Sequence, residues 1–195
     1  MWGKDFLATY TVTITDDFLD TVFNVKNLGG EDFVHQAALH TYFDISSVGN
    51  LSIEGSFKGK EYLDKVRAGG ANRRLLISGF LRTRFALPTT NLPRSLLQMT
   101  GETKTEERDA ITISQETDSV YFGVKDPSVV DAGKGKKISV VDAMGWTDCV
   151  VWNPFGNEGM GYNSFVCAES VAFNPVTVLA GGEWEGSMKL KVSDI

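Results

Sequence analysis

Residues 6 to 15, FLATYTVTIT, carry the pattern that decides the fold class of this chain. Apolar side chains occupy every second position, namely Phe6, Ala8, Tyr10, Val12 and Ile14. Leu7 and four threonines fill the positions between them. A period of two with many β-branched residues is typical of a strand that has one buried and one polar face. We therefore expect this segment to be a half-buried β-strand.

The same period continues along most of the chain. Further strands are predicted at LDTVFNV (19–25), FVHQAALHTYF (33–43), LSIEGSF (51–57), DAITISQ (109–115), SVYFGV (119–124), KISVVDA (137–143), DCVVWNP (148–154), NSFVCAE (163–169), VTVLA (176–180) and SMKLKV (187–192). Turns rich in Gly and Asn separate them, and long helical periodicity is almost absent. The pattern predicts an all-β protein, a large antiparallel sandwich or barrel.

Length and composition favour one globular domain over residues 1–195. A chain of 195 residues with 42% hydrophobic residues can bury a real core. No run of about 18 apolar residues could span a membrane, and the N-terminus has the pattern of neither a signal peptide nor a transit peptide. We expect a cytoplasmic location. Cys149 and Cys167 lie in apolar runs, so we expect buried free thiols rather than a disulfide.

Residues 67–102 depart from the strand pattern, and we interpret about 67–101 as a basic insertion. Between Lys65 and Gly101 there is no Asp or Glu, and the basic residues there are Lys65, Arg67, Arg73, Arg74, Arg82, Arg84 and Arg94. Since the whole chain carries −6, the rest carries −13. This is not the charge distribution of a general nucleic-acid binder. The segment is either a disordered excursion or a basic arm that contacts an anionic ligand or membrane surface.

His40 is one of only two histidines, and alternation places it on the more polar face of its strand, with Gln36 and Tyr42. It is either a hydrogen-bonded structural residue or a group held at the floor of a groove. His35 falls on the apolar face or at the strand entrance, where we expect a structural role.

Glu169 ends the apolar run FVCA, so it either reaches solvent at a strand end or lies in a cleft with a raised pKa. A glutamate raised toward neutral pH and a histidine form a workable acid and base couple. Aromatic residues near 152–165 could stack on sugar rings, although such residues are more often core. The chain has no phosphate-binding glycine loop, GxSxG, CxxC or HExxH motif, so metal and nucleotide chemistry have little support.

A series of ordered motifs resembles the glucose-6-phosphate 1-epimerases, also called hexose-6-phosphate mutarotases. They are ALHTYFDIS followed by LSIEGSFKGKEYLDKV, then ETDSVY, VVWNPFGNEGMGY, FVCAES and GGEWEG. The run VVWNPFGNEGMGYNSFVCAESV is especially similar to the apospory-associated protein C-like branch. The resemblance covers residues 1–66 and 102–195, and it implies a galactose-mutarotase-like β-supersandwich.

The resemblance also implies an activity, the interconversion of the α and β anomers of glucose 6-phosphate. By that analogy His40 is the general acid that protonates the ring oxygen, and Glu169 is the general base that deprotonates the anomeric hydroxyl. Asp118 matches the aspartate that holds sugar hydroxyls. No metal or organic cofactor is implied, and the implied partner is a small hexose 6-phosphate, with neither nucleic acid nor membrane. We expect a monomer.

The chain also departs from the family pattern. Ser119 and Gly182 replace an arginine and a proline of the motifs, and the N-terminal segments that bring the phosphate-binding arginines have no counterpart here. We therefore expect a mutarotase-like domain that lacks its N-terminal portion. The alternative is a carbohydrate-binding fragment of that fold with impaired or no catalysis.

Overall fold

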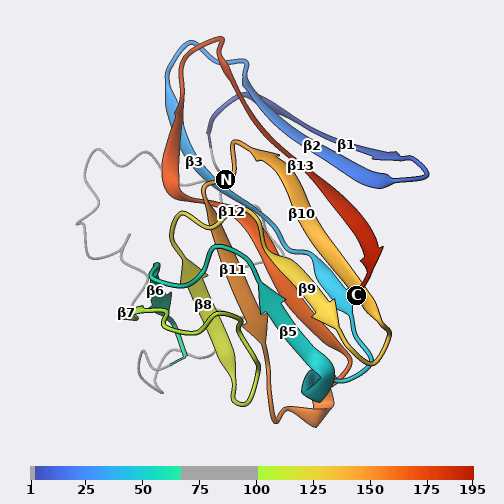
Figure 1. Cartoon of the computed structure of the whole chain (residues 1–195). Helices are drawn as coiled ribbons and strands as arrows, with labels where there is room; N and C mark the ends of the chain where they lie inside the picture. Colours follow the sequence, from blue (N-terminus) through green and yellow to red (C-terminus); the bar gives the residue numbers. More distant parts are fainter. Residues whose placement is uncertain (1–2, 67–100) are drawn as a thin grey trace.

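A computed structural model describes residues 3–66 and 101–195, and its strands form two antiparallel sheets (Figure 1). The first sheet contains, in spatial order, β1 (Phe6–Ile14), β2 (Phe18–Asn27), β13 (Glu183–Asp194), β10 (Lys136–Met144), β9 (Ser128–Asp131) and β5 (Leu51–Glu54). The second contains β3 (Phe33–Leu39), β12 (Phe165–Val178), β11 (Asp148–Asn153), β8 (Thr117–Tyr121), β6 (Glu61–Asp64) and β7 (Glu102–Thr105). A short strand, β4 (Tyr42–Asp44), pairs with β12 beyond the end of β3. The prediction of an all-β antiparallel protein is confirmed.

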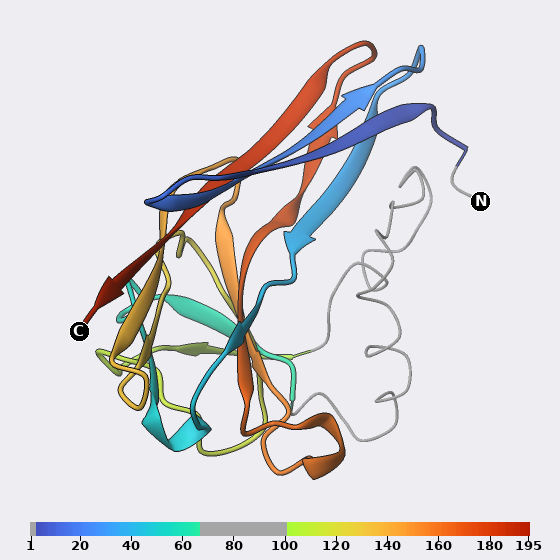
Figure 2. The ribbon, with the colours of Figure 1, turned by 90° about the vertical axis from the view of Figure 1, so that its right-hand side faces the viewer.

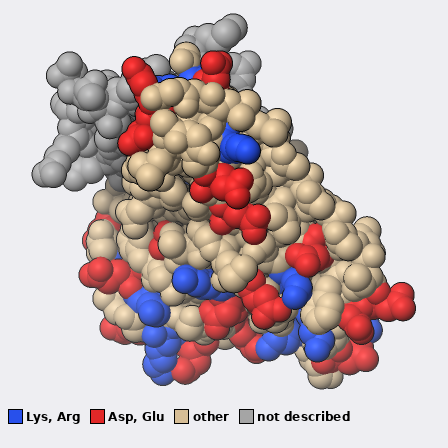
Figure 3. Space-filling model, turned by 90° about the horizontal axis from the view of Figure 1, so that it is seen from above, with Lys and Arg blue, Asp and Glu red and all other residues tan. Residues whose placement is uncertain are grey.

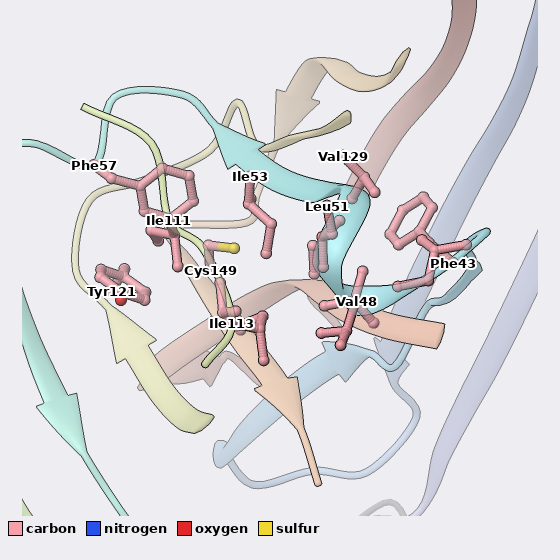
Figure 4. Packing of buried hydrophobic residues seen from close by; sticks show 14 of the residues in the cluster. Phe43, Val48, Leu51, Ile53, Phe57, Ile111, Ile113, Tyr121, Val129 and Cys149 are labelled. Atoms are coloured by element: carbon pink, nitrogen blue, oxygen red, sulfur yellow. The ribbon is translucent and has the colours of Figure 1, made fainter. Parts of the chain in front are cut away.

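The main core lies between the two sheets. Figure 4 shows this layer, with Ile53 and Val129 from the first sheet and Tyr121 and Cys149 from the second. Ile53 has no exposed surface, and Tyr121 is 1% exposed. Each large side chain buried in this way contributes about 1.5–3 kcal/mol. This layer fixes the second sheet from behind, so its opposite face is available for a site.

A second cluster fills the end of the molecule where β2, β3, β12 and β13 run together (Figure 2). The rings of Trp146 and Trp184 meet edge to face at 5.1 Å. Gly186 packs beneath them, and a Cβ at that position would lie 2.5 Å from Trp146, so only glycine fits. His35 is 2% exposed, and the centroid of its ring lies 4.9 Å from that of Trp184. This packing agrees with the expectation that His35 is a structural residue.

Several predicted strand limits were wrong. FVHQAALHTYF is two strands with a break at His40 and Thr41, whereas NSFVCAE and VTVLA belong to one strand of 14 residues, β12. Residues 109–115 form no strand, because Ile111 makes only a single bridge with Ile53, and their isoleucines fill the core as loop residues. Strands β6, β7 and β9 were not predicted, because each has four residues and is too short for alternation to stand out.

The burial predicted for β1 was also wrong. Residues 7–14 are exposed, and the exposed fraction reaches 53% at Tyr10 and 77% at Ile14. β1 is the edge of the first sheet, and in the described part of the chain no second layer covers its apolar positions. Seen from above, uncharged residues cover wide parts of the described surface, and a group of acidic side chains lies among them (Figure 3).

The predicted basic insertion at about 67–101 lies outside the described residues, apart from Gly101. Both cysteines are buried and free, as expected. Among the described residues, no helix has the length and apolar character needed to cross a membrane.

Candidate active site

A row of side chains crosses the outer face of the second sheet. Tyr42 of β4 is opposite Cys167 of β12, Cys167 is opposite Trp152 of β11, and Trp152 is opposite Asp118 of β8. The row ends at Lys65, whose backbone N–H donates to the carbonyl of Asp118 at 2.9 Å. Directly paired residues on neighbouring strands point to the same side of a sheet. Residues far apart in the sequence therefore form one continuous surface.

Glu169 stands beside this row. It lies two residues after Cys167 on β12 and so shares its face, and its own paired neighbour across β11 is Val150. The next residue in that direction is Val120. Glu169 is 1% exposed, and burial raises the pKa of its carboxyl to about 8, an effect that Asp118 strengthens and Lys65 opposes. The structure therefore places Glu169 in a buried site and not at a solvent-exposed strand end.

His40 occupies the break between β3 and β4. The N–H of Thr41 donates to the carbonyl of Leu39 at 2.9 Å, a bond from residue i+2 to residue i that is typical of a γ-turn with His40 at its centre. β3 and β4 keep one register against β12, because Ser170 pairs with Leu39 and Cys167 pairs with Tyr42. His40 therefore lies directly opposite Glu169.

The ring nitrogen Nδ1 of His40 lies 3.3 Å from Oε1 of Glu169. The imidazole stacks on the ring of Tyr42, with 4.8 Å between the ring centroids. It is nearly perpendicular to the ring of Trp152, with 5.7 Å between the centroids. Burial lowers the pKa of His40, as does Lys65, while the charge of Asp118 acts in the opposite direction. The prediction that His40 shares a face with Tyr42 is confirmed.

Asp118 lies on the same face and forms an ion pair with Lys65, with 2.5 Å between Oδ1 and Nζ. The side chain of Lys65 is only 5% exposed. Lys65 was not predicted as a site residue, because its charge was assigned to the basic segment that follows. Alternation from the buried Leu63 would have placed it on the site face.

A cleft of about 550 Å³ adjoins the row. It is lined by Lys65, Val66, Glu116, Asp118, Trp152, Pro154, Phe155, Gly156, Asn157, Glu158 and Met160. Trp152 borders both the cleft and His40, whereas His40 and Glu169 do not line the cleft themselves. The amide of Asn153 donates to the carbonyls of Tyr162 and Phe165, at 2.9 and 2.7 Å, and so anchors the loop that supplies lining residues 154–158 and 160.

The donor atoms of His40, Cys167 and Glu169 lie within 4.8 Å of one another, a spacing that a metal ion could bridge. Burial and the nearby Glu169 hold the pKa of the Cys167 thiol far above its ordinary value. Because the thiolate is the form that binds metals, a metal at this position would have to displace the thiol proton. The contact between His40 and Glu169 also suits proton transfer.

Comparison with known proteins gives the family. The profile of the aldose 1-epimerase family matches residues 2–191. The chain belongs to the aldose 1-epimerase family. A Cenchrus ciliaris protein named as a candidate glucose-6-phosphate 1-epimerase is 28% identical over 173 residues, which cover 84% of this chain and 43% of that protein. The chain therefore spans less than half the length of this relative.

Solved structures agree on the fold. A candidate mutarotase of Salmonella typhimurium matches 100% of this chain and 56% of its own, with a TM-score of 0.72 and 19% identity. A candidate aldose 1-epimerase of Escherichia coli matches 98% of this chain and 62% of its own, with a TM-score of 0.69 and 14% identity. The expected mutarotase-like β-fold is confirmed.

Proposed function

We propose that this chain interconverts the α and β anomers of an aldose, with glucose 6-phosphate as the substrate. The observation that carries the proposal is the pairing of His40 with Glu169, whose Nδ1 and Oε1 atoms are 3.3 Å apart in a site where Glu169 is almost fully buried. Membership of the aldose 1-epimerase family and the name of the Cenchrus ciliaris relative support the reaction and the substrate.

The pair holds the one proton that the reaction needs. Two groups in contact titrate as a pair, and between the lowered pKa of His40 and the pKa of about 8 of Glu169 they carry a single proton. That proton rests on Glu169, the group with the higher pKa. Its transfer across the 3.3 Å contact leaves His40 protonated, as the proton donor, and Glu169 ionised, as the proton acceptor.

Ring opening uses the donor and the acceptor together. Glu169 takes the proton of the anomeric hydroxyl, the C1–O1 bond becomes a carbonyl, the C1–O5 bond breaks, and O5 takes a proton from His40. Because Nδ1 faces Glu169, we assign the proton transfer to the ring oxygen to Nε2. Rotation about C1–C2 turns the other face of the aldehyde toward O5. Closure reverses both transfers: O5 returns its proton to His40, and Glu169 gives its proton to the carbonyl oxygen.

Two further features fit a sugar. Oε2 of Glu169 is buried without a hydrogen-bond partner in the described structure, which is costly unless a ligand supplies one. Trp152 and Tyr42 offer aromatic faces beside His40, and Asp118 can accept hydrogen bonds from sugar hydroxyls.

A second substrate, the uncharged aldose, is favoured by the charge of the cleft. Among the described lining residues, Glu116, Asp118 and Glu158 are acidic, whereas the cation, Lys65, is already paired with Asp118. A phosphate dianion meets repulsion from these carboxylates, and a neutral sugar does not. The choice between the two substrates is therefore part of the test.

The test is anomer exchange, followed by NMR with glucose 6-phosphate and with glucose, for the wild type and for His40→Ala and Glu169→Gln. Positioned acid and base groups contribute about 10²- to 10⁴-fold each, so both variants should lose at least 100-fold of the catalysed rate. Glu107→Gln, at an exposed carboxylate, is the matched control. If the wild type exchanges anomers no faster than the His40 variant with either sugar, the chain is a carbohydrate-binding fragment and the proposal fails.

A further inference from the structure

Lys65 is a buried cation that the acid and base pair does not explain. Lysine is almost never buried unless it is paired. The side chain of Lys65 is 5% exposed, whereas the lysine of the surface pair Lys58–Asp109 is 59% exposed. A surface pair contributes little, but a buried pair requires good geometry to offset the desolvation of both ions.

Two bonds join Lys65 to the same residue. Its Nζ lies 2.5 Å from Oδ1 of Asp118, and its backbone N–H donates to the carbonyl of Asp118 at 2.9 Å. The register of β6 against β8, in which Leu63 pairs with Val120, sets this position. No other described side chain bonds to Oδ2 of Asp118, so that oxygen is available to a ligand while Oδ1 is held by Lys65.

We propose that Lys65 is a positioning residue, which fixes the carboxylate of Asp118 at the cleft and offsets its negative charge beside the acid and base pair. The proposal rests on the proposed function and deepens it. In this proposal Lys65 does not contact the reacting atoms. Lys65 acts through its bond to Asp118 and through its positive charge.

The electrostatics of the site give this arrangement a measurable signature. Lys65 lowers the pKa of both His40 and Glu169, and Asp118 raises both. The other titratable groups that face the pair are Cys167 and Tyr42. Both are uncharged at neutral pH, because their pKa values are raised. Lys65 and Asp118 therefore shift the pH range of the one-proton state in opposite directions.

The first experiment follows the imidazole directly and needs no activity. The chain has two histidines, and His35 is buried in the core, so the His40 ring signal can be assigned by its loss in His40→Ala and followed by NMR from pH 4 to 9. Lys65→Met should move the His40 midpoint to higher pH, and Asp118→Asn should move it to lower pH. The double variant should return toward the wild type, because the two charges are removed together.

The second experiment measures the rate of anomer exchange against pH. Lys65→Met should move both limbs of the profile to higher pH, so the ratio of the rate at pH 9 to the rate at pH 7 rises, while Lys65→Arg keeps the charge and should keep the wild-type limbs. Lys104→Met is the matched control. Lys104 of β7 forms an ion pair with Asp64, the last residue of β6, whose side chain lies on the face of the sheet opposite the site.

The outcomes separate the two proposals. If the wild type shows no exchange but the His40 midpoint moves as described, the proposed function fails and the role of Lys65 stands. If the midpoints of Lys65→Met and Lys104→Met both equal that of the wild type, Lys65 has only a structural role and the inference fails. If Lys65→Met does not fold, the His40 midpoint in Asp118→Asn decides alone. The inference then fails if that midpoint does not move to lower pH.

Discussion

Replacing Glu169 by glutamine should stabilise the folded chain, and the gain should grow with pH. Burial raises the pKa of this carboxyl from 4.5 to about 8. Because the folded-state pKa is raised, the contribution of Glu169 to stability is fully present below pH 4.5 and is lost as the pH rises through about 8. At about 1.4 kcal/mol for each pH unit between those values, ionised Glu169 destabilises the fold by about 5 kcal/mol.

The measurement is urea unfolding followed by tryptophan fluorescence at pH 5, 7 and 9. The amide does not titrate, so its own packing adds a constant offset, and only the change with pH is diagnostic. From pH 5 to pH 9 the free energy of unfolding of Glu169→Gln should gain about 4 kcal/mol relative to the wild type. Glu107→Gln, at an exposed position, should show no such trend. A difference that stays constant within about 1 kcal/mol would refute the reasoning that burial governs this carboxyl.

Three other substitutions test the frame around the site. Gly186→Ala should lower the free energy of unfolding by about 1–3 kcal/mol, since its Cβ would lie 2.5 Å from Trp146, and an unchanged urea midpoint would contradict that packing. Tyr121→Phe removes the 3.0 Å hydrogen bond to the buried Glu106 and should lower the same quantity by about 1–3 kcal/mol, whereas equal stability would mean that the bonds from Arg108 alone satisfy the carboxylate. Asn153→Ala releases the loop at 154–164, so limited proteolysis with mass spectrometry should find new cuts there, and an unaltered digest would argue against the anchoring role.

Alternation was enough to predict most of the long strands, because their side-chain period is repeated over many residues. It failed where tertiary structure overrides local pattern. Residues 109–115 alternate well but form only the bridge of Ile111 with Ile53, so their burial comes from packing without a ladder. β1 alternates equally well, yet residues 7–14 are exposed, because a sequence pattern does not reveal whether a second layer covers the strand.

The sequence predicted the identity of most site residues better than their arrangement. Alternation placed His40 on the polar face, the position of Glu169 after an apolar run made it a candidate partner, and the resemblance supplied Asp118. None of these reveals that His40 lies directly opposite Glu169, since that depends on β3 and β4 sharing one register against β12. Lys65 was missed because its charge was assigned to the neighbouring basic segment, whereas the ladder between β6 and β8 places it beside Asp118.

The shared register of β12 with its neighbours bears on which changes the chain can accept. Along β12, Ala168 points into the core and Glu169 points to the site, so deleting or inserting one residue in the strand would exchange them. A carboxylate would then enter the apolar layer, and a methyl group would replace the proton acceptor. A substitution at one of these positions can have a small or a large effect on the fold, whereas a change in strand length moves every following side chain to the opposite face. Insertions and deletions should therefore be tolerated in the loops between strands, and in β12 only near the irregularity between Ala172 and Val176.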